Sequence, residues 1–224
     1  MPPKTTSEHL VVSLVEKAIV CGKEVPEGSI VACSIDTGVP ADERLSIVYV
    51  PEEDEFTPHI IADGLQTSKS RVCLSVTKRG RERRLAIEYG NQAWKLVRSV
   101  PTGSGSHISL LSGDFYSNDF IMNESGLLHP VVSWLERMDG VRHEFFSQPA
   151  VFDVDSFTVQ QQVANSKDGT PIDYVVLSPK DAQHKAGELP ALITGYGTMG
   201  ISIMMRHLEP MLGGSLSGLG SRVA

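Results

Sequence analysis

A succession of short runs rich in β-branched and other apolar residues constrains the fold of this chain more than any other feature. The runs cover residues 29–35, 45–50, 71–77, 84–89, 94–100, 108–112, 119–122, 131–135 and 141–145. Gly, Pro, Asn or Asp separates almost all of them, at intervals of roughly a dozen residues or a little more. Crossover helices would require a helical periodicity that these residues lack. The pattern therefore predicts an antiparallel all-β sandwich, barrel or propeller.

Residues 10–18 leave two interpretations open. The apolar positions Leu10, Val11, Leu14 and Val15 fit an amphipathic helix that Ser7 would cap. The neighbouring Val-Val and Ile-Val pairs suit a strand equally well.

The pattern changes after residue 150. Two longer runs, 158–165 and 171–178, flank Asp168-Gly169, and an Asp-Gly pair between alternating runs is a strong hairpin signal. A third run, 190–195, is short and contains a continuously apolar stretch, as a strand buried on both faces would be. We expect a domain boundary at about residue 150, and a small, flexible tail from Gly213 onward.

Charge argues against two classes of partner. The chain has 224 residues and a formal net charge of −7, so neither a nucleic-acid backbone nor an anionic membrane surface is an expected partner. Basic residues cluster once, over residues 78–84, around Gly80. We expect a solvated hairpin turn there, with a binding patch as the less favoured alternative.

Cysteine and histidine usage argues against disulfide and metal chemistry. Cys21, Cys33 and Cys73 are scattered and form no Cys-x-x-Cys pair, which suits a reducing, cytoplasmic compartment. The apolar run 10–15 ends at Glu16 and Lys17, before it reaches the length of a signal-peptide core, so neither export nor membrane insertion is expected. The seven histidines show no metal-ligand spacing, and no metal or cofactor is expected. Asp153 and Asp155 are interpreted as turn or cap residues.

Two stretches of the sequence resemble motifs of known functional sites, but each lacks a feature that its site requires. Gly195-Tyr196-Gly197-Thr198-Met199-Gly200 matches the dinucleotide fingerprint Gly-x-Gly-x-x-Gly, but no Asp or Glu follows Glu209 to hold a ribose. The nucleophile motif Gly-x-Ser-x-Gly is missing from the sequence. Gly213-Gly214-Ser215-Leu216-Ser217 comes near it but ends in serine, so we interpret Ser215 as part of the tail.

An ordered series of motifs across residues 113–203 resembles the prolyl oligopeptidase family of serine peptidases. Gly113-Asp114, Ser117-Asn118-Asp119-Phe120 and Gly126-Leu127-Leu128-His129-Pro130 look like the family's late propeller, with Leu127 where phenylalanine is usual. Phe152-Asp153 and then Ser166-Lys167-Asp168-Gly169-Thr170 are similar to its re-entry into the hydrolase domain. Residues 20–112 resemble the family more loosely.

The strand and loop at residues 190–197 resemble those that end in Gly-Tyr-Gly-Gly-Phe in this family. By that resemblance Tyr196 is an oxyanion donor, the only catalytic residue assigned in this chain. Thr198-Met199-Gly200 departs from the family's Gly-Phe-x, and Ile203-Met204-Met205-Arg206 replaces a stretch that usually carries Thr-Pro.

The resemblance implies a mainly β fold with three parts. Residues 1–150 would form about three incomplete blades at the C-terminal side of a β-propeller. Residues 151–212 would begin an incomplete α/β-hydrolase domain, and residues 213–224 would be a flexible tail. Exposed strand edges in such a chain would invite pairing or aggregation.

The resemblance also implies an activity. A complete relative would be a cytoplasmic peptidase whose seven-bladed propeller covers a Ser-His-Asp site and admits short peptides, which are cut after proline. The family's nucleophile, aspartate and histidine would lie beyond residue 224, so this chain alone is not expected to hydrolyse peptides. The alternatives are a non-enzymatic β-propeller binding module, for which no fixed repeat was found, and a nucleotide-binding protein using Gly195 to Gly200. The oligomeric state is left open.

Overall fold

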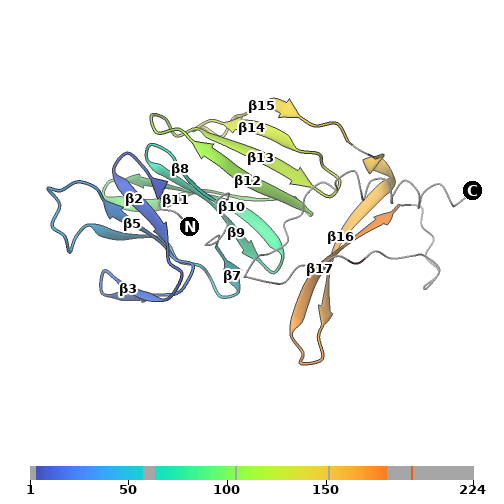
Figure 1. Ribbon diagram of the computed structural model, residues 1–224, viewed down its shortest axis with the longest axis horizontal. Helices are drawn as coiled ribbons and strands as arrows, with labels where there is room; N and C mark the ends of the chain where they lie inside the picture. The colour runs from blue at the N-terminus through green and yellow to red at the C-terminus, as the bar shows by residue number, and fades with distance from the viewer. Residues whose placement is uncertain (1–3, 58–63, 104, 151, 181–192, 194–224) are drawn as a thin grey trace, which may run out of the picture. The chain divides into compact units, whose positions relative to one another are not determined.

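The computed structural model describes residues 4–57, 64–103, 105–150, 152–180 and 193, and these residues are almost entirely strands and turns (Figure 1). They divide into two compact units. One unit holds the described residues of 1–102, 108–123 and 133–146, and the other holds those of 103–107, 124–132 and 147–224.

The first sheet has the strand order β1-β2-β5-β6 and is antiparallel. Its strands are β1 (Lys4–Thr5), β2 (His9–Ser13), β5 (Ile30–Ser34) and β6 (Leu45–Tyr49). Of residues 10–18, for which both a helix and a strand fitted the sequence, residues 10–13 lie in β2 and none is helical. The register of β2 with β5 brings Val11 opposite Ala32, and both side chains are fully buried.

The second sheet has the order β11-β10-β9-β7, and β8 also pairs with β9. Its strands are β7 (Glu55–Phe56), β8 (Leu65–Thr67), β9 (Arg71–Lys78), β10 (Arg81–Gly90) and β11 (Ala93–Pro101). Lys78 pairs with Arg81, so Arg79 and Gly80 form a two-residue turn between β9 and β10. Their φ angles of 49° and 67° are both positive, as a type I′ hairpin turn requires.

The third sheet runs in chain order, β12-β13-β14-β15. Its strands are β12 (Ser106–Gly113), β13 (Phe120–Gly126), β14 (Val132–Glu136) and β15 (Arg142–Ser147). After it come the short 3-10 helix η1 (Val154–Ser156) and a hairpin of β16 (Phe157–Asn165) and β17 (Pro171–Pro179). Sheets of about four antiparallel strands in succession are the unit of a β-propeller, in which each sheet is one blade.

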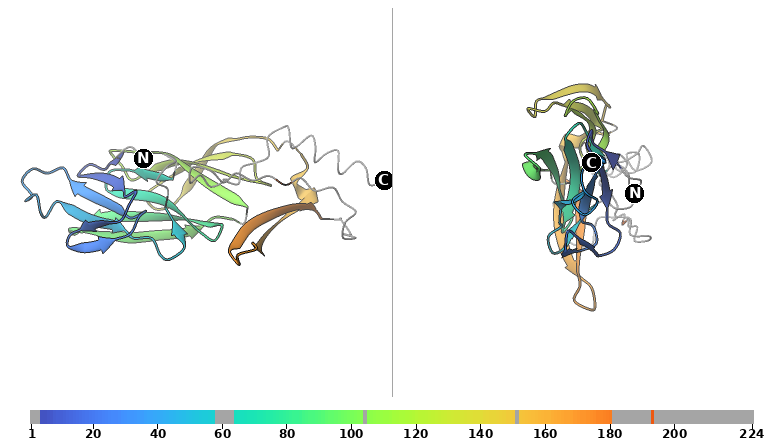
Figure 2. Two further views of the ribbon diagram at one scale, coloured as in Figure 1. Left: turned by 60° about the horizontal axis from the view of Figure 1, so that its bottom comes forward. Right: turned by 90° about the vertical axis from the view of Figure 1, so that its left-hand side faces the viewer.

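Successive side chains along a strand point to opposite faces of its sheet. In the second sheet, side chains on each of the two faces are buried in a core shared with a neighbouring sheet. On β9, Val72, Leu74 and Val76 join a core with Ile30 and Val48 of the first sheet. Cys73, between them, joins a separate core of the third sheet that contains Ile108, Leu110, Phe120 and Met122. Each side chain that is fully buried in this way contributes about 1.5–3 kcal/mol. Because of this alternation, β9 contributes to the cores shared with the first sheet and with the third sheet. Figure 2 shows the ribbons of these sheets from two further sides.

A hairpin covers the outer face of the first sheet. Strands β3 (Ala18–Val20) and β4 (Lys23–Val25) pair with each other, and Val20 and Val25 pack on Val31. Val31 lies between Ile30 and Ala32 of the inner core, so this cluster occupies the opposite face of the sheet.

The predicted fold class is confirmed as far as the partial β-propeller is concerned, and the strands predicted from residue 29 to residue 178 are found with small shifts at their ends. The boundary near residue 150 stays a prediction. The run 190–195 lies outside the described residues, apart from Ile193.

The prediction for the basic run 78–84 is right at its tip and wrong at its end. Arg79 and Gly80 form an exposed turn, whereas Arg84 is only 2% exposed. Because Leu85 points into the core shared with the first sheet, the alternation of β10 turns Arg84 toward the third sheet.

Candidate functional site

The residue assigned to catalysis, Tyr196, lies outside the described residues, as do Gly195, Gly200 and Ser215. The motifs that carried the resemblance at residues 113–130 and 152–172 lie within them.

Asn118 is the centre of the first motif. Its side chain is buried in the turn between β12 and β13. The Oδ1 atom accepts hydrogen bonds from Ser68 Oγ and from the Ser70 amide, both at 2.9 Å. The Nδ2 group donates to Ser70 Oγ at 2.9 Å. Asn118 therefore joins a turn of the second sheet to a turn of the third, and its role in the structure is architectural.

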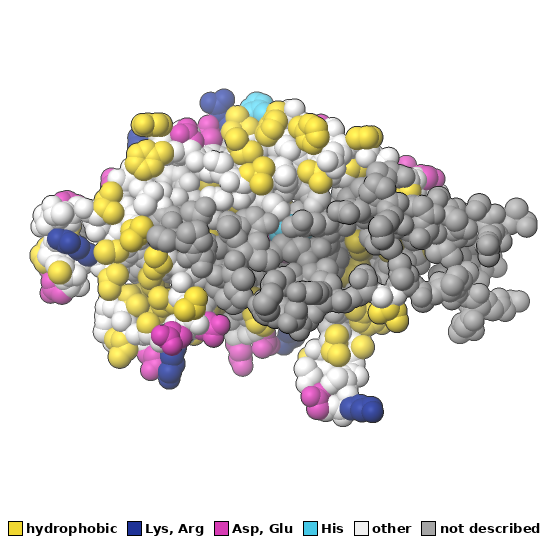
Figure 3. Space-filling model, viewed as in Figure 1, with side chains coloured by type: hydrophobic (Ala, Val, Ile, Leu, Met, Phe, Trp, Pro, Cys, Tyr) yellow, Lys and Arg dark blue, Asp and Glu magenta, His cyan; other side chains and the backbone are white. Residues whose placement is uncertain are grey.

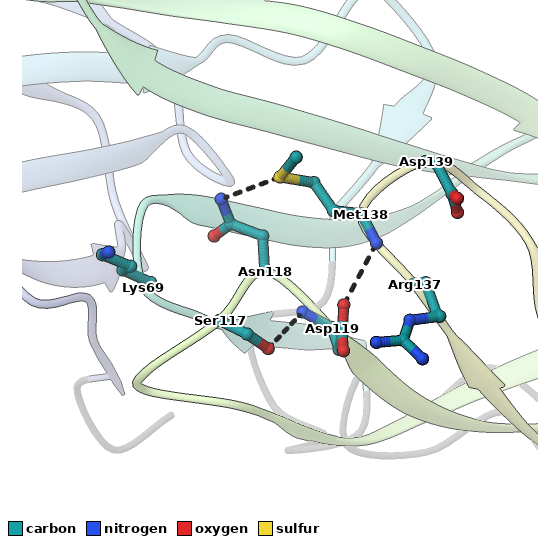
Figure 4. A pocket seen from close by; sticks show the side chains of 7 residues that line it. All are labelled: Lys69, Ser117, Asn118, Asp119, Arg137, Met138 and Asp139. Carbon is teal, nitrogen blue, oxygen red and sulfur yellow. Dashed lines mark hydrogen bonds between the residues drawn. The ribbon is translucent and has the colours of Figure 1, made fainter.

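A pocket of about 370 Å³ lies beside Asn118 (Figure 4). It is lined by Lys69, Ser117, Asn118, Asp119, Arg137, Met138 and Asp139. The carboxylate of Asp119 accepts a hydrogen bond from the Met138 amide at 3.1 Å, and the Met138 carbonyl accepts one from Arg71 at 2.9 Å. These bonds fix the turn that forms one wall of the pocket.

The residues that line this pocket do not form a hydrolytic site. It supplies two cations and two carboxylates, but none of its seven lining residues is a histidine or a cysteine. Ser117 accepts a hydrogen bond from the Asp119 amide at 3.2 Å. A hydroxyl nucleophile needs a base within hydrogen-bonding reach, and no histidine lines this pocket to serve as one.

The second motif, Gly126 to Pro130, forms the connection between β13 and β14. The Gly126 amide donates to the His129 carbonyl at 2.9 Å, and the His129 amide donates back to the Gly126 carbonyl at 3.1 Å. The motif thus closes a tight loop through main-chain bonds, while the His129 side chain is exposed.

The third motif forms the predicted hairpin. Asn165 pairs with Pro171, so residues 166–170 make the turn between β16 and β17. Gly169 has φ +85°, and its amide donates to the Ser166 carbonyl at 3.0 Å. Hydrogen bonds from the Ser166 hydroxyl and then from the Thr170 amide lower the pKa of Asp168 to about 2. Asp153 caps η1 by accepting from the Asp155 amide at 3.2 Å, as its assignment to a cap predicted.

A buried ion cluster is the main polar feature that the sequence did not reveal. Glu136 accepts from Arg84 at 2.6 Å and from Arg142 at 2.9 Å, and Arg98 lies 3.6 Å away. Arg84 and Glu136 are both buried and come from the second and third sheets. They are 52 residues apart in the chain, so no local spacing could have paired them.

A second polar cluster fixes the loop before β7. The Glu55 side chain is buried and accepts from the hydroxyl of Tyr49, from the Glu52 amide at 3.0 Å and from Arg83 at 2.7 Å. Burial alone would raise the pKa of Glu55, but these hydrogen bonds outweigh it and lower the pKa. The pKa of Tyr49 is raised, first by burial and then by its bond to Glu55.

Within the described residues, no three His, Cys, Asp or Glu side chains are grouped so that they could hold a metal ion. In the same part of the chain, no helix is both long and apolar enough to cross a membrane. The three cysteines are free thiols, and burial raises the pKa of Cys73 to about 12.

Comparison with known proteins points to peptidases. No family model matches the chain. The chain is 26% identical over 173 residues to the uncharacterised peptidase y4nA of Sinorhizobium fredii. This match covers 76% of the chain and 23% of the peptidase.

Solved structures of peptidases share the fold. A post-proline cleaving enzyme from Rickettsia typhi matches 80% of the chain with a TM-score of 0.63 at 17% identity. Oligopeptidase B from Trypanosoma brucei matches 94% of the chain with a TM-score of 0.71 at 14% identity. The chain covers 26% and 29% of these two structures, respectively, so it spans between a fifth and a third of the length of the relatives it matches. The resemblance inferred from the sequence motifs is thereby confirmed: the chain is similar in sequence to a peptidase, and its fold matches part of a post-proline cleaving enzyme and of oligopeptidase B.

Proposed function

We propose that this chain is the propeller part, with the beginning of the hydrolase domain, of a serine peptidase that cleaves short peptides after proline. The observation that carries the proposal is the run of three successive blade-like sheets. The chain that contains them matches oligopeptidase B over 94% of its length. The Rickettsia typhi neighbour is a post-proline cleaving enzyme, which supports the proposal of cleavage after proline. The three free thiols suit a reducing compartment, so we place the protein in the cytoplasm.

The proposed division of labour follows from the motifs. The propeller would limit access to short peptides, and the hairpin β16–β17 would be the first part of an α/β-hydrolase sheet. Tyr196 would donate its hydroxyl to the oxyanion that forms when the peptide carbonyl is attacked. The sequence contains no Gly-x-Ser-x-Gly, so we propose that these 224 residues alone do not hydrolyse peptides.

Two measurements test the proposal. The first is to read the transcript beyond the codon for Ala224 for an in-frame Gly-x-Ser-x-Gly followed by an aspartate and a histidine. If the reading frame closes without them, the peptidase assignment fails for this protein. The second is to assay the 224-residue chain with an N-blocked Gly-Pro amide, and turnover above that of a heat-denatured sample would refute the inactivity of the chain.

If the longer reading frame exists, Tyr196 can be tested in its product. Loss of one oxyanion donor typically lowers kcat by about 100-fold or more. Tyr196→Phe in the longer protein is therefore expected to lower kcat strongly while KM changes little. An unchanged kcat would remove Tyr196 from the catalytic residues and leave the family assignment untouched.

A further inference from the structure

His9 is a buried titratable residue that the proposed activity does not use. It begins β2 of the first sheet and is only 4% exposed. Its ring lies edge-on to the rings of Tyr89 and Trp94, with ring centroids 4.2 Å and 5.2 Å away. Tyr89 lies on β10 and Trp94 on β11, so His9 forms part of the contact between the first and second sheets. All three residues belong to one compact unit.

The surroundings of His9 suit a neutral imidazole and not an imidazolium. The Nδ1 atom is buried, and no residue in the described part of the chain forms a hydrogen bond with it. A neutral ring tolerates this more easily because one of its nitrogens carries no proton, whereas both nitrogens of an imidazolium are donors. Protonation would therefore place a charge with an unpaired donor inside the contact, and burial of such a charge is costly.

The first sheet supplies one charge that acts on His9, and it does not offset this cost. Burial lowers the pKa of His9 from its ordinary value of 6.5, and the exposed carboxylate of Glu8 opposes that shift only in part. On β5, the residue paired with His9 is Ser34, which does not ionise in this pH range.

The second sheet turns its charged side chains away from His9. Tyr89 and Trp94 pair with each other across β10 and β11 and face the first sheet. Side chains alternate along both strands, so Glu88 and Lys95, which also pair with each other, lie on the opposite face. The phenol of Tyr89 is thus the titratable group that faces His9 from these two strands.

His9 also fixes the turn that precedes it, residues 6–8. The Thr6 amide donates to the His9 carbonyl at 2.8 Å, and the His9 amide donates to Thr6 Oγ1 at 2.9 Å. The Ser7 amide and hydroxyl both donate to the Lys69 carbonyl, at 3.0 Å and 2.6 Å, so this turn is bound to a turn of the second sheet. The Lys69 side chain lines the pocket described above.

We propose that His9 makes the contact between the first and second sheets sensitive to pH. With a neutral imidazole, the ring packs on its two aromatic partners and turn 6–8 stays bound to Lys69. With an imidazolium, the ring leaves this site for water and the turn separates from the second sheet. Strand β1 has two residues and β2 begins at His9, so this opening requires only the ends of two strands to separate. Val11 and Ile30 keep the rest of the first sheet packed on the second.

The sign and the size of the effect follow from proton linkage. The pKa of His9 is lower when the contact is closed than when it is open, so the open form binds protons more readily. The closed form is therefore favoured above pH 6.5, and opening is favoured as the pH falls below that value. From about pH 7.5 to 5.5, the equilibrium constant for opening should rise several-fold, with a ceiling of about tenfold for one titrating group. Glu55 titrates below this range, because its pKa is lowered from 4.5.

Hydrogen–deuterium exchange of the 224-residue chain tests this proposal, at about pH 7.5, 6.5 and 5.5 and with each rate corrected for intrinsic exchange. The amides of Thr6, Ser7 and His9 are hydrogen-bonded in the closed form, and their protection should fall several-fold over this range. Their free energy of opening should stay below the free energy of global unfolding measured with urea at the same pH, because only the turn and the two strand ends open.

Three variants separate the role of His9 from a general effect of acid. His9→Gln and His9→Phe remove the titratable ring and should abolish the dependence of protection on pH. His143→Gln on β15 is the matched control and should keep the dependence of the parent. The His143 side chain is exposed, so it stays in water in either protonation state. Figure 3 shows histidine, in cyan, at the surface of the molecule over the third sheet.

The proposal is wrong if the protection of these amides does not change with pH in the parent, or if both His9 variants keep the parent's dependence. It is also wrong if the turn opens only with global unfolding, at the same free energy. Should neither His9 variant fold, an NMR titration of the His9 ring in the parent decides. A pKa at or above 6.5 would show that the closed contact accommodates the imidazolium, whereas a lower pKa is the expected result.

Discussion

At Glu136 one buried carboxylate meets three guanidinium groups, from Arg84, Arg98 and Arg142. This cluster has three cations and one anion, so removing Arg84 and removing the charge of Glu136 have different consequences. Removing Arg84 leaves Glu136 with two cations, whereas removing the charge of Glu136 leaves Arg84 buried beside the thioether of Met122 with no anion. An unpaired buried charge is far more costly than a buried pair replaced by apolar atoms.

We therefore expect an asymmetry between two substitutions. Glu136→Gln should lower the free energy of unfolding by about 3–5 kcal/mol, because it strands the charge of Arg84. Arg84→Met should cost less, about 1–2 kcal/mol, since its aliphatic replacement still fills the site. Urea denaturation of both variants measures the difference. Equal costs, or a larger cost for Arg84→Met, would show that packing around Arg84 rather than charge dominates this site.

Glu55 predicts a pH dependence of stability. Its pKa is lowered in the folded state, so its ionised form stabilises the protein above its unfolded pKa of about 4.5. That stabilisation should be lost as the pH falls from about 4.5 toward the folded pKa. Glu55→Gln is expected to lower the free energy of unfolding at pH 7 by about 1–3 kcal/mol and to flatten its dependence on pH below 4.5. Glu53→Gln, an exposed residue of the same loop, is the control that should change neither quantity.

At the scale of elements, several residues that stand out in the sequence are required by the geometry of turns. Arg79 and Gly80 adopt the positive φ angles of a two-residue hairpin, and the motif from Gly113 to Phe120 is a turn held by Asn118. Gly113 ends β12 at a place where a Cβ atom would lie 2.0 Å from the Thr67 carbonyl oxygen. A side chain there cannot be accommodated without moving the main chain of β8, so the glycine allows the second and third sheets to approach.

Gly113→Ala is expected to lower the free energy of unfolding by about 2–3 kcal/mol, because the added methyl group meets main chain rather than a flexible side chain. Gly90→Ala is the matched control at the end of β10, where a Cβ atom would have nothing within 4 Å. That control should be neutral or slightly stabilising. Comparable losses in the two variants would mean that backbone freedom, and not close approach, explains Gly113.

At the scale of the whole molecule, the second sheet couples its two neighbours. The core that contains Val72 and Leu74 faces the first sheet, and the core that contains Cys73 faces the third. If the first or the third sheet separated from the second sheet, one face of β9 would be exposed, and the other face of β9 belongs to the other core. We therefore expect these three sheets to unfold together rather than blade by blade.

The two tryptophans of the chain report on the two cores separately. Trp94 packs against the core between the first and second sheets, and Trp134 packs against the core between the second and third. In Trp134→Phe and Trp94→Phe, the fluorescence of the remaining tryptophan should change at the same urea concentration as the far-UV circular dichroism of that variant. A fluorescence transition that precedes the dichroism transition in either variant would show that one blade unfolds first.

Local patterns were enough to predict most strands, the hairpin at Asp168-Gly169 and the family resemblance. Alternation and turn chemistry act over a few residues, so they can be read along the chain. The short strands β1, β4, β7 and β8 were not predicted, because two or three residues carry too little periodicity. The resemblance placed Asn118 in a family motif, but only the structure shows the hydrogen bonds that it makes across two sheets.

The sequence by itself determined that this chain is built of antiparallel strands, where most of them turn, and which peptidases it resembles. The tertiary structure decided which face of each strand is buried, and hence that Arg84 lies inside the molecule opposite a glutamate 52 residues away. It also decided that the hairpin β3–β4 covers the face of the first sheet opposite to the core shared with the second sheet. The physical reason is range: turns and alternation depend on neighbours in sequence, whereas burial of a face depends on which other sheet packs against it.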